Sequence, residues 1–181
     1  VPDDLERPSG NLAPEDRWIL SEFDHVMARV EDAWARIDIY SAAQAIKGFG
    51  TGIFPSHWLE MTKSRLYEGD EGATWTLHRV VRDLLCAFTP ICPFFTHYLS
   101  STLYGKSSVD VRSFPRLPSN TVGKEAESMR ALTPVISEFN SMVWKLKKDS
   151  GLSLKSPVSD VSIPPELSII ENTLVQMHSI E

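Results

Sequence analysis

Apolar residues recur at helical spacing early in the chain. They follow one another at steps of three and four residues, at Leu20, Phe23, Met27, Val30, Trp34 and Ile37. This is the period of one face of an α-helix. Pro14, followed by two acidic residues, is typical of a helix start, because acidic groups favour the positive end of the helix dipole. The pattern predicts an amphipathic helix of about six turns that begins at Pro14.

The next apolar period is interrupted by glycine. Apolar residues continue at helical spacing over 39–49, and the glycine-rich stretch 48–52 is expected to break that helix. Pro55 is expected to open another helix that runs to Tyr67. A phosphate-binding reading of the glycines is less favoured, because such a loop follows a strand and this one follows a helix.

Prolines mark the helix limits in the second half of the chain. The apolar segment 77–88 resumes over 94–103, and Pro90 and Pro93 are expected to end or kink it. Pro134 is expected to bend a helix over 129–146 near its middle, and Gly151 to follow its end.

The remaining pattern completes the expected fold. Residues 161–163 alternate like a short strand, and Pro165 is expected to open a last helix. The sequence therefore predicts an all-α antiparallel helix bundle with a small C-terminal α/β appendage. Its expected parts are a flexible N-terminal segment over 1–13, the bundle over 14–118, and a helix, short strand and final helix over 119–181.

Composition narrows the class of protein. The chain has 181 residues, 42% of them hydrophobic, which is enough for a buried core. It has no run of about 18 apolar residues, so no membrane span is expected. Residues 1–4 do not resemble a signal peptide and lack an initiator methionine, which suggests a processed chain or an excised fragment. Cys86 and Cys92 are expected to be buried thiols in a reducing, cytoplasmic setting.

The net charge of −6 is unevenly distributed and argues against indiscriminate binding to nucleic acid. Residues 1–40 hold ten acidic side chains and four arginines, whereas 101–160 hold nine basic and six acidic ones. An RNA contact is therefore expected away from the first helix and through local basic clusters, with no binding to DNA.

Catalytic patterns are weak in this sequence. The five histidines have no HExxH spacing, no serine lies in a G-x-S-x-G turn, and acidic pairs fall on predicted solvent-facing helix surfaces. We therefore predict no catalytic residue and no metal site. The basic clusters are more informative, because basic side chains attract RNA phosphates. Lysine at the C-terminal end of a helix can equally stabilise the negative end of the helix dipole. The candidate RNA-binding residues are Lys63, Arg65, Arg79, Arg82, Lys145, Lys147 and Lys148, although Arg65 could instead be a structural pairing residue.

Several stretches, read in order, resemble one known family. Residues 16–21, DRWILS, resemble the opening of the anticodon-binding bundle of class I aminoacyl-tRNA synthetases for valine, isoleucine, leucine and methionine. Residues 58–67, WLEMTKSRLY, resemble a stretch of the valyl branch. Residues 76–95, and 103–115 with their YG, SV and FP pairs, also resemble that family. His57 stands where the family would have an acidic or amide residue.

The resemblance implies a division of labour. The full synthetase would join an amino acid to tRNA with ATP and Mg²⁺, using a catalytic domain that this chain lacks. The chain itself would hold no cofactor, would be inactive, and would bind the anticodon stem and loop of tRNA, with valine tRNA favoured. Its partners would be that tRNA and the catalytic domain of the same synthetase. The alternatives are the same region of an isoleucyl or leucyl enzyme, a stand-alone helical protein-interaction module, and, more distantly, a metal or thiol enzyme.

Overall fold

The computed structural model describes residues 6–105, 114–117, 121 and 123–181, and is helical through most of that length. Helix α1 (Pro14–Ala35) has the predicted start and length. It ends in a tight turn in which the Asp38 amide donates to the Ala33 carbonyl at 2.8 Å. Ile37 takes the left-handed conformation in this turn, with φ of 57°, and is 80% exposed. Its expected place in the buried stripe was wrong, because the helix ends before it.

The helix break predicted at the glycine-rich stretch does not occur. Helix α2 (Ile39–Gly48), the π-helix η1 (Phe49–Leu59) and helix α3 (Glu60–Tyr67) follow one another without a gap. Pro55 lies inside η1 and does not start a helix. Proline cannot donate the usual helical hydrogen bond, and the wider π turn accommodates that loss without ending the helix.

The proline boundaries of the next segment are confirmed. Helix α4 (Glu71–Phe88) begins at Asp70, whose carboxylate accepts a hydrogen bond from the Ala73 amide at 2.7 Å. Helix α5 (Pro93–Tyr104) follows a short turn at 89–92. In the described part of the chain neither Cys86, in α4, nor Cys92, in this turn, forms a disulfide, as expected, but both side chains are only partly buried, so their expected burial was wrong.

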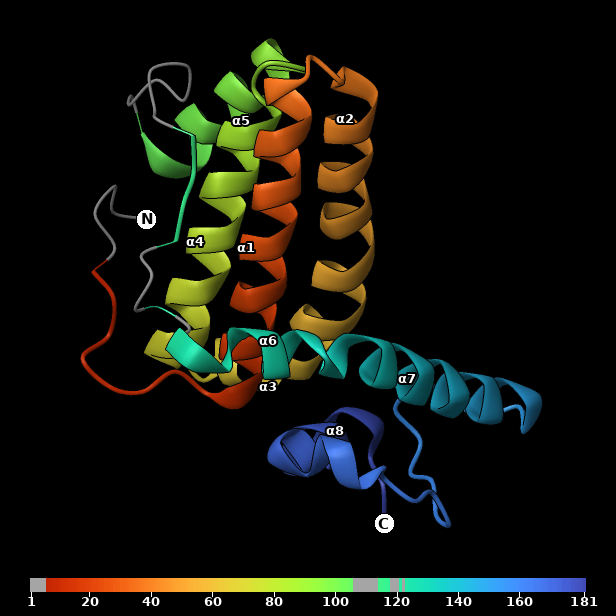
Figure 1. Ribbon diagram of the computed structural model, residues 1–181. Coiled ribbons are helices and arrows are strands. Elements are labelled where there is room, and N and C mark those ends of the chain that lie inside the picture. Colours follow the sequence, from red (N-terminus) through yellow and green to blue (C-terminus); the bar gives the residue numbers. More distant parts are fainter. Residues whose placement is uncertain (1–5, 106–113, 118–120, 122) are drawn as a thin grey trace.

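The C-terminal part crosses one end of the bundle (Figure 1). The 3₁₀ turn η3 (Gly123–Glu125) leads into helix α6 (Ala126–Arg130), and the chain bends at Ala131 before helix α7 (Leu132–Asp149). The predicted bend therefore lies before Pro134, since a proline ring clashes with the carbonyl four residues earlier. Gly151 follows the end of α7 with φ of 66°, as predicted.

The final segment folds back against α7 and α3. It contains the 3₁₀ helix η4 (Pro165–Ile170) and helix α8 (Glu171–His178). The strand predicted over 161–163 is absent from this described segment. An isolated parallel bridge between Val158 and Ile180 is present instead. The expected domain boundary near residue 118 and the first residues of the expected flexible segment lie outside the described residues.

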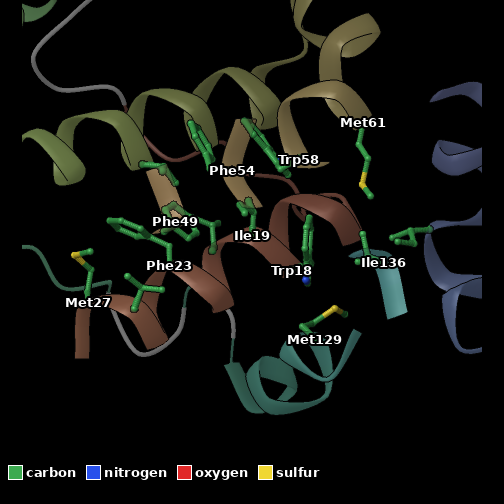
Figure 2. Packing of buried hydrophobic residues seen from close by; sticks show 14 of the residues in the cluster. Trp18, Ile19, Phe23, Met27, Phe49, Phe54, Trp58, Met61, Met129 and Ile136 are labelled. Atoms are coloured by element: carbon green, nitrogen blue, oxygen red, sulfur yellow. The ribbon is translucent and has the colours of Figure 1, made fainter. Parts of the chain in front are cut away.

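A large apolar core joins α1, η1 and α4 to the C-terminal helices. Ile19 and Phe23 of α1 face the aromatic side chains of η1, whereas Trp18 lies on the side of α1 towards Met129 (Figure 2). The rings of Phe49 and Phe54 stack with centroids 5.8 Å apart, which the wide π turn permits for residues five apart. Met129 of α6 and Ile136 of α7 reach the same core.

Candidate nucleic-acid interface

The predicted cations at the end of α7 divide into exposed and buried side chains. Lys145 and Lys148 are exposed, and neither has an ion-pair or hydrogen-bond partner within the described part of the chain. Lys147 is fully buried, because it continues the inward-facing series Ile136, Asn140 and Val143 at helical spacing. The C-terminal end of α7, which carries these lysines, extends away from the bundle and from α4 (Figure 1).

Lys147 holds the C-terminal segment to the bundle. Its Nζ donates to the carbonyl oxygens of Leu154 at 2.7 Å and His178 at 2.6 Å. Burial lowers the pKa of Lys147. These contacts bring the ends of α7 and α8 together. The amino group is buried and bonded inside the protein, so it is not available to an RNA phosphate.

Arg65 is the centre of a charged cluster at the start of α1. Its guanidinium donates to Glu15 Oε1 at 2.7 Å, to Asp16 Oδ2 at 2.8 Å and to Asp70 Oδ1 at 2.8 Å. Trp58 Nε1 donates to the other oxygen of Asp16 at 3.1 Å. This geometry is that of the structural pairing residue considered as the alternative for Arg65. We call Glu15, Asp16, Trp58, Arg65 and Asp70 the charged cluster.

In the charged cluster, the effect of burial on the pKa values is opposed by hydrogen bonds and ion pairs. Burial raises the pKa of Asp16, and Arg65 opposes that rise through a hydrogen bond and its charge. Burial alone would lower the pKa of Arg65, but the carboxylates around it raise that pKa overall. The pKa of Asp70 is lowered, because the Ala73 amide and Arg65 outweigh its partial burial. Arg65 therefore stays charged, with its charge directed at carboxylates inside the protein.

The remaining predicted cations lie on the surface with local partners. Lys63 Nζ lies 3.2 Å from Glu60 on the same helix. Arg79 donates to Asp83 Oδ2 at 2.7 Å and to the Arg116 carbonyl at 3.0 Å. The Arg82 guanidinium lies over the Tyr104 ring, 5.6 Å from its centroid. Arg79 and Arg82 line one small hollow of about 80 Å³, so they are the two predicted α4 residues that the fold brings together.

A second buried polar cluster joins η1, α7 and α8. His178 Nε2 lies 2.7 Å from Asn140 Oδ1, and Asn140 Nδ2 lies 2.8 Å from His57 Nδ1. The amide oxygen can only accept and its nitrogen can only donate, so His178 donates and His57 accepts. Trp144 stacks on the His57 ring. We call His57, Asn140, Lys147 and His178 the histidine network.

The histidine network requires both rings to be neutral. Burial lowers the pKa of His57. Burial lowers the pKa of His178 to about 4, and repulsion from Lys147 and from a proton on His57 contributes to this shift. A second proton on His57 would face the Asn140 amide donor, so protonation breaks the chain of hydrogen bonds.

The sequence matches the family described as the anticodon-binding domain of tRNA ligase over residues 16–163. The match spans α1 through α7 and the loop beyond. The chain belongs to this family. In the described part of this anticodon-binding domain, no group of three or more histidine, cysteine or acidic residues is placed to hold a metal ion. No described helix is long and apolar enough to span a membrane.

Similar proteins extend the resemblance beyond the family match. A valine–tRNA ligase of Nanoarchaeum equitans is 28% identical over 175 residues, which cover 97% of this chain and 22% of that protein. Those of Saccharolobus solfataricus and Methanothrix thermoacetophila are 31% and 33% identical, over 86% and 85% of this chain and 18% and 17% of theirs. The anticodon-binding domain thus spans about a fifth of these relatives.

The two quoted family stretches that begin at Asp16 and Trp58 meet in the charged cluster. Asp16 comes from the first stretch, and Trp58 and Arg65 come from the second. Residues of both stretches therefore take part in holding α1 against η1 and α3. The histidine network was missed in the sequence, although Asn140 and Lys147 share the helical spacing of Ile136 and Val143.

Proposed function

We propose that this chain is the anticodon-binding part of a valine–tRNA ligase and binds the anticodon stem and loop of valine tRNA. The observation that carries the proposal is the family match over residues 16–163, on a helical bundle whose curated relatives are named valine–tRNA ligases. These names favour valine over the isoleucine and leucine alternatives. The charged cluster and the histidine network support the proposal by fixing the bundle as a rigid platform.

The aminoacylation reaction would be carried out by the remainder of a full-length protein. That remainder would join valine to tRNA with ATP and Mg²⁺, in the cytoplasm, and would be the protein partner of this bundle. The present chain would contribute affinity and orientation and would be inactive alone. Phosphate contacts would set the position of the RNA, and contacts to unstacked loop bases would supply specificity.

Only some of the predicted cations are proposed to contact RNA. Lys145 and Lys148 are proposed phosphate contacts, because both ammonium groups are exposed and uncommitted in the described residues. Lys63, Arg79 and Arg82 have surface partners that a phosphate could replace. Arg65 and Lys147 are left out, since their donors are used inside the protein.

Salt dependence tests the α7 contact. In the double variant Lys145→Ala and Lys148→Ala, tRNA affinity is expected to fall and the slope of log affinity against log salt to decrease by about 1–2. The measurement is filter binding of a valine tRNA transcript at several salt concentrations. Glu138→Gln, on an exposed position of the same helix, is the matched control. An unchanged slope places these lysines off the interface.

Anticodon exchange tests the function itself. Binding is measured at fixed salt to valine and isoleucine tRNA transcripts and to the same two with their anticodons exchanged. The proposal expects affinity to follow the valine anticodon. Affinity that follows the isoleucine anticodon identifies the isoleucyl alternative, and affinity that follows neither anticodon nor tRNA identity overturns the proposed function. Retention of a protein but no tRNA in a pull-down would support the interaction-module alternative.

A further inference from the structure

A groove of about 440 Å³ runs between α1 and the α2–η1 helix. The two helices pack side by side and form one flank of the bundle (Figure 1). The side chains at its rim can stack or form hydrogen bonds, and are His25, Arg29, Tyr40, Ser41 and Gln44. Its floor is apolar and includes Val26, Phe49 and Ile53. The volume lies in the usual range for small-ligand sites.

The rim of the groove carries an aromatic ring that is exposed to solvent. Tyr40 is 74% exposed, on the first turn of α2. Gln44 lies one turn further along the same helix and is also exposed. Tyr40 and Gln44 make no hydrogen bond or ring contact in the described residues. A flat ring and a bifunctional amide are thus offered together to solvent.

Arg29 lies in a strongly acidic helix. Arg17, Arg36 and Arg116 each pair with a carboxylate. Arg29 has no such partner within the part of the chain that the structure describes. Nearby acidic groups are committed elsewhere, because Asp32 pairs with Arg36 and Glu31 with Arg116. Glu22, at the groove, accepts a hydrogen bond from the Thr133 hydroxyl. The positive charge of Arg29 is therefore available to an anion.

We infer that this groove binds one unstacked nucleobase of a single-stranded RNA loop, an inference that rests on the proposed function and that places an RNA contact on the first helix, contrary to the expectation from its acidic charge. The base stacks on Tyr40, its edge meets the amide of Gln44 and the ring nitrogens of His25, and Arg29 meets the adjoining phosphate. Stacking on an aromatic ring with hydrogen bonds to the base edge is the usual way that single-stranded RNA is read. An apolar peptide is a poorer occupant, because it would cover His25, Arg29 and Gln44 without satisfying them.

Two glycines give a matched pair of variants. A Cβ added at Gly48, on the groove lining, meets no atom within 4 Å, and the same is true of Gly52, which does not line the groove. Both are helical, so a larger side chain is compatible with the backbone at each position. Gly48→Leu should therefore fill the groove, and Gly52→Leu should add the same bulk outside it.

Fluorescence anisotropy of the 181-residue chain tests the groove with two RNA hairpins. One carries the anticodon stem and loop of valine tRNA, and the other has the same stem closed by a non-nucleotide linker. Wild type is expected to prefer the first. Gly48→Leu and Tyr40→Ala are expected to weaken its binding roughly tenfold, and Tyr40→Phe to recover most of that loss because it keeps the ring. Gly52→Leu should bind as wild type does.

The outcomes separate this inference from the proposed function. Unchanged loop preference in folded Gly48→Leu and Tyr40→Ala, checked by circular dichroism, overturns the groove as a base site and leaves the proposed function standing. Equal binding of both hairpins by wild type also overturns the groove. Failure of wild type to bind either hairpin or the full valine tRNA overturns the proposed function and this inference with it.

Photocrosslinking provides a readout that needs no variant. A 4-thiouridine is placed at each loop position in turn, and the crosslinked chain is digested with trypsin. The inference expects a crosslink in peptide 37–47, which carries Tyr40 and Gln44. Crosslinks confined to peptides that carry no groove residue, such as those around Lys145, contradict it.

Discussion

The charged cluster and the histidine network both hold parts of the bundle together, but the first uses charged side chains and the second uses a neutral amide and neutral rings. The charged cluster surrounds Arg65 with three carboxylates, one of them on the fully buried side chain of Asp16. The histidine network passes hydrogen bonds through the neutral amide of Asn140 to two neutral rings. The first therefore depends on a charge being present, and the second depends on two charges being absent.

The difference has consequences for robustness to pH. Arginine keeps its charge at all ordinary pH values, so the charged cluster needs only its acids to stay ionised. Free histidine takes up a proton near neutrality, so a network that needs neutral rings begins to lose stability as the pH falls below about 6.5. Three variants test this contrast, from the largest expected effect to the smallest.

Removing the cation of the charged cluster should have the largest effect on stability. Arg65→Met leaves Glu15 and Asp16 buried without their partner, and is expected to cost about 3–5 kcal/mol of unfolding free energy. Urea denaturation measures the change. Lys63→Met, which removes an exposed cation from the same helix, should cost less than about 0.5 kcal/mol. A similar small cost for both variants would show that burial of the carboxylates is not compensated by Arg65.

Removing the amide of the histidine network should cost less. Asn140→Leu keeps the volume but leaves a ring nitrogen of His57 and one of His178 without partners. The expected loss is about 2–3 kcal/mol, because two buried polar atoms become unsatisfied. The same urea experiment measures it, and Asn172→Leu on the exposed side of α8 is the control. A neutral or stabilising result would mean that the network is replaceable by apolar packing.

Acid should selectively weaken the histidine network. The pKa of His178 is about 4 in the folded chain and about 6.5 when unfolded. The unfolded state therefore binds more protons between these values, and stability present above pH 6.5 is lost as pH falls towards 4. We expect a loss on the order of 2 kcal/mol over this window.

The variant His178→Gln isolates this titration. A glutamine amide can still donate to Asn140, but it does not take up a proton in this range. Its unfolding free energy should change less than that of wild type between pH 6.5 and 4, as measured by urea denaturation at several pH values. Parallel profiles for the two proteins would assign the acid sensitivity to other groups.

The sequence by itself determined the helices and most of their limits. The apolar period from Leu20 to Trp34 became the buried face of α1, and Pro93 and Gly151 stand where helices begin and end. These features depend on backbone sterics and on neighbours within a few residues, which a linear pattern contains. The family resemblance came from ordered short stretches for the same reason, and the family match confirmed it.

Only the tertiary structure decided which polar residues are available. Arg65 finds Asp16 from 49 positions away, and His178 finds Asn140 from 38. Helical spacing shows which face of a helix a cation occupies, but a distant carboxylate or carbonyl decides whether it remains free. The continuous helix through Gly48–Gly52 and the groove beside it could not be predicted for the same reason. Packing of η1 against α1 selects the π turn over a break.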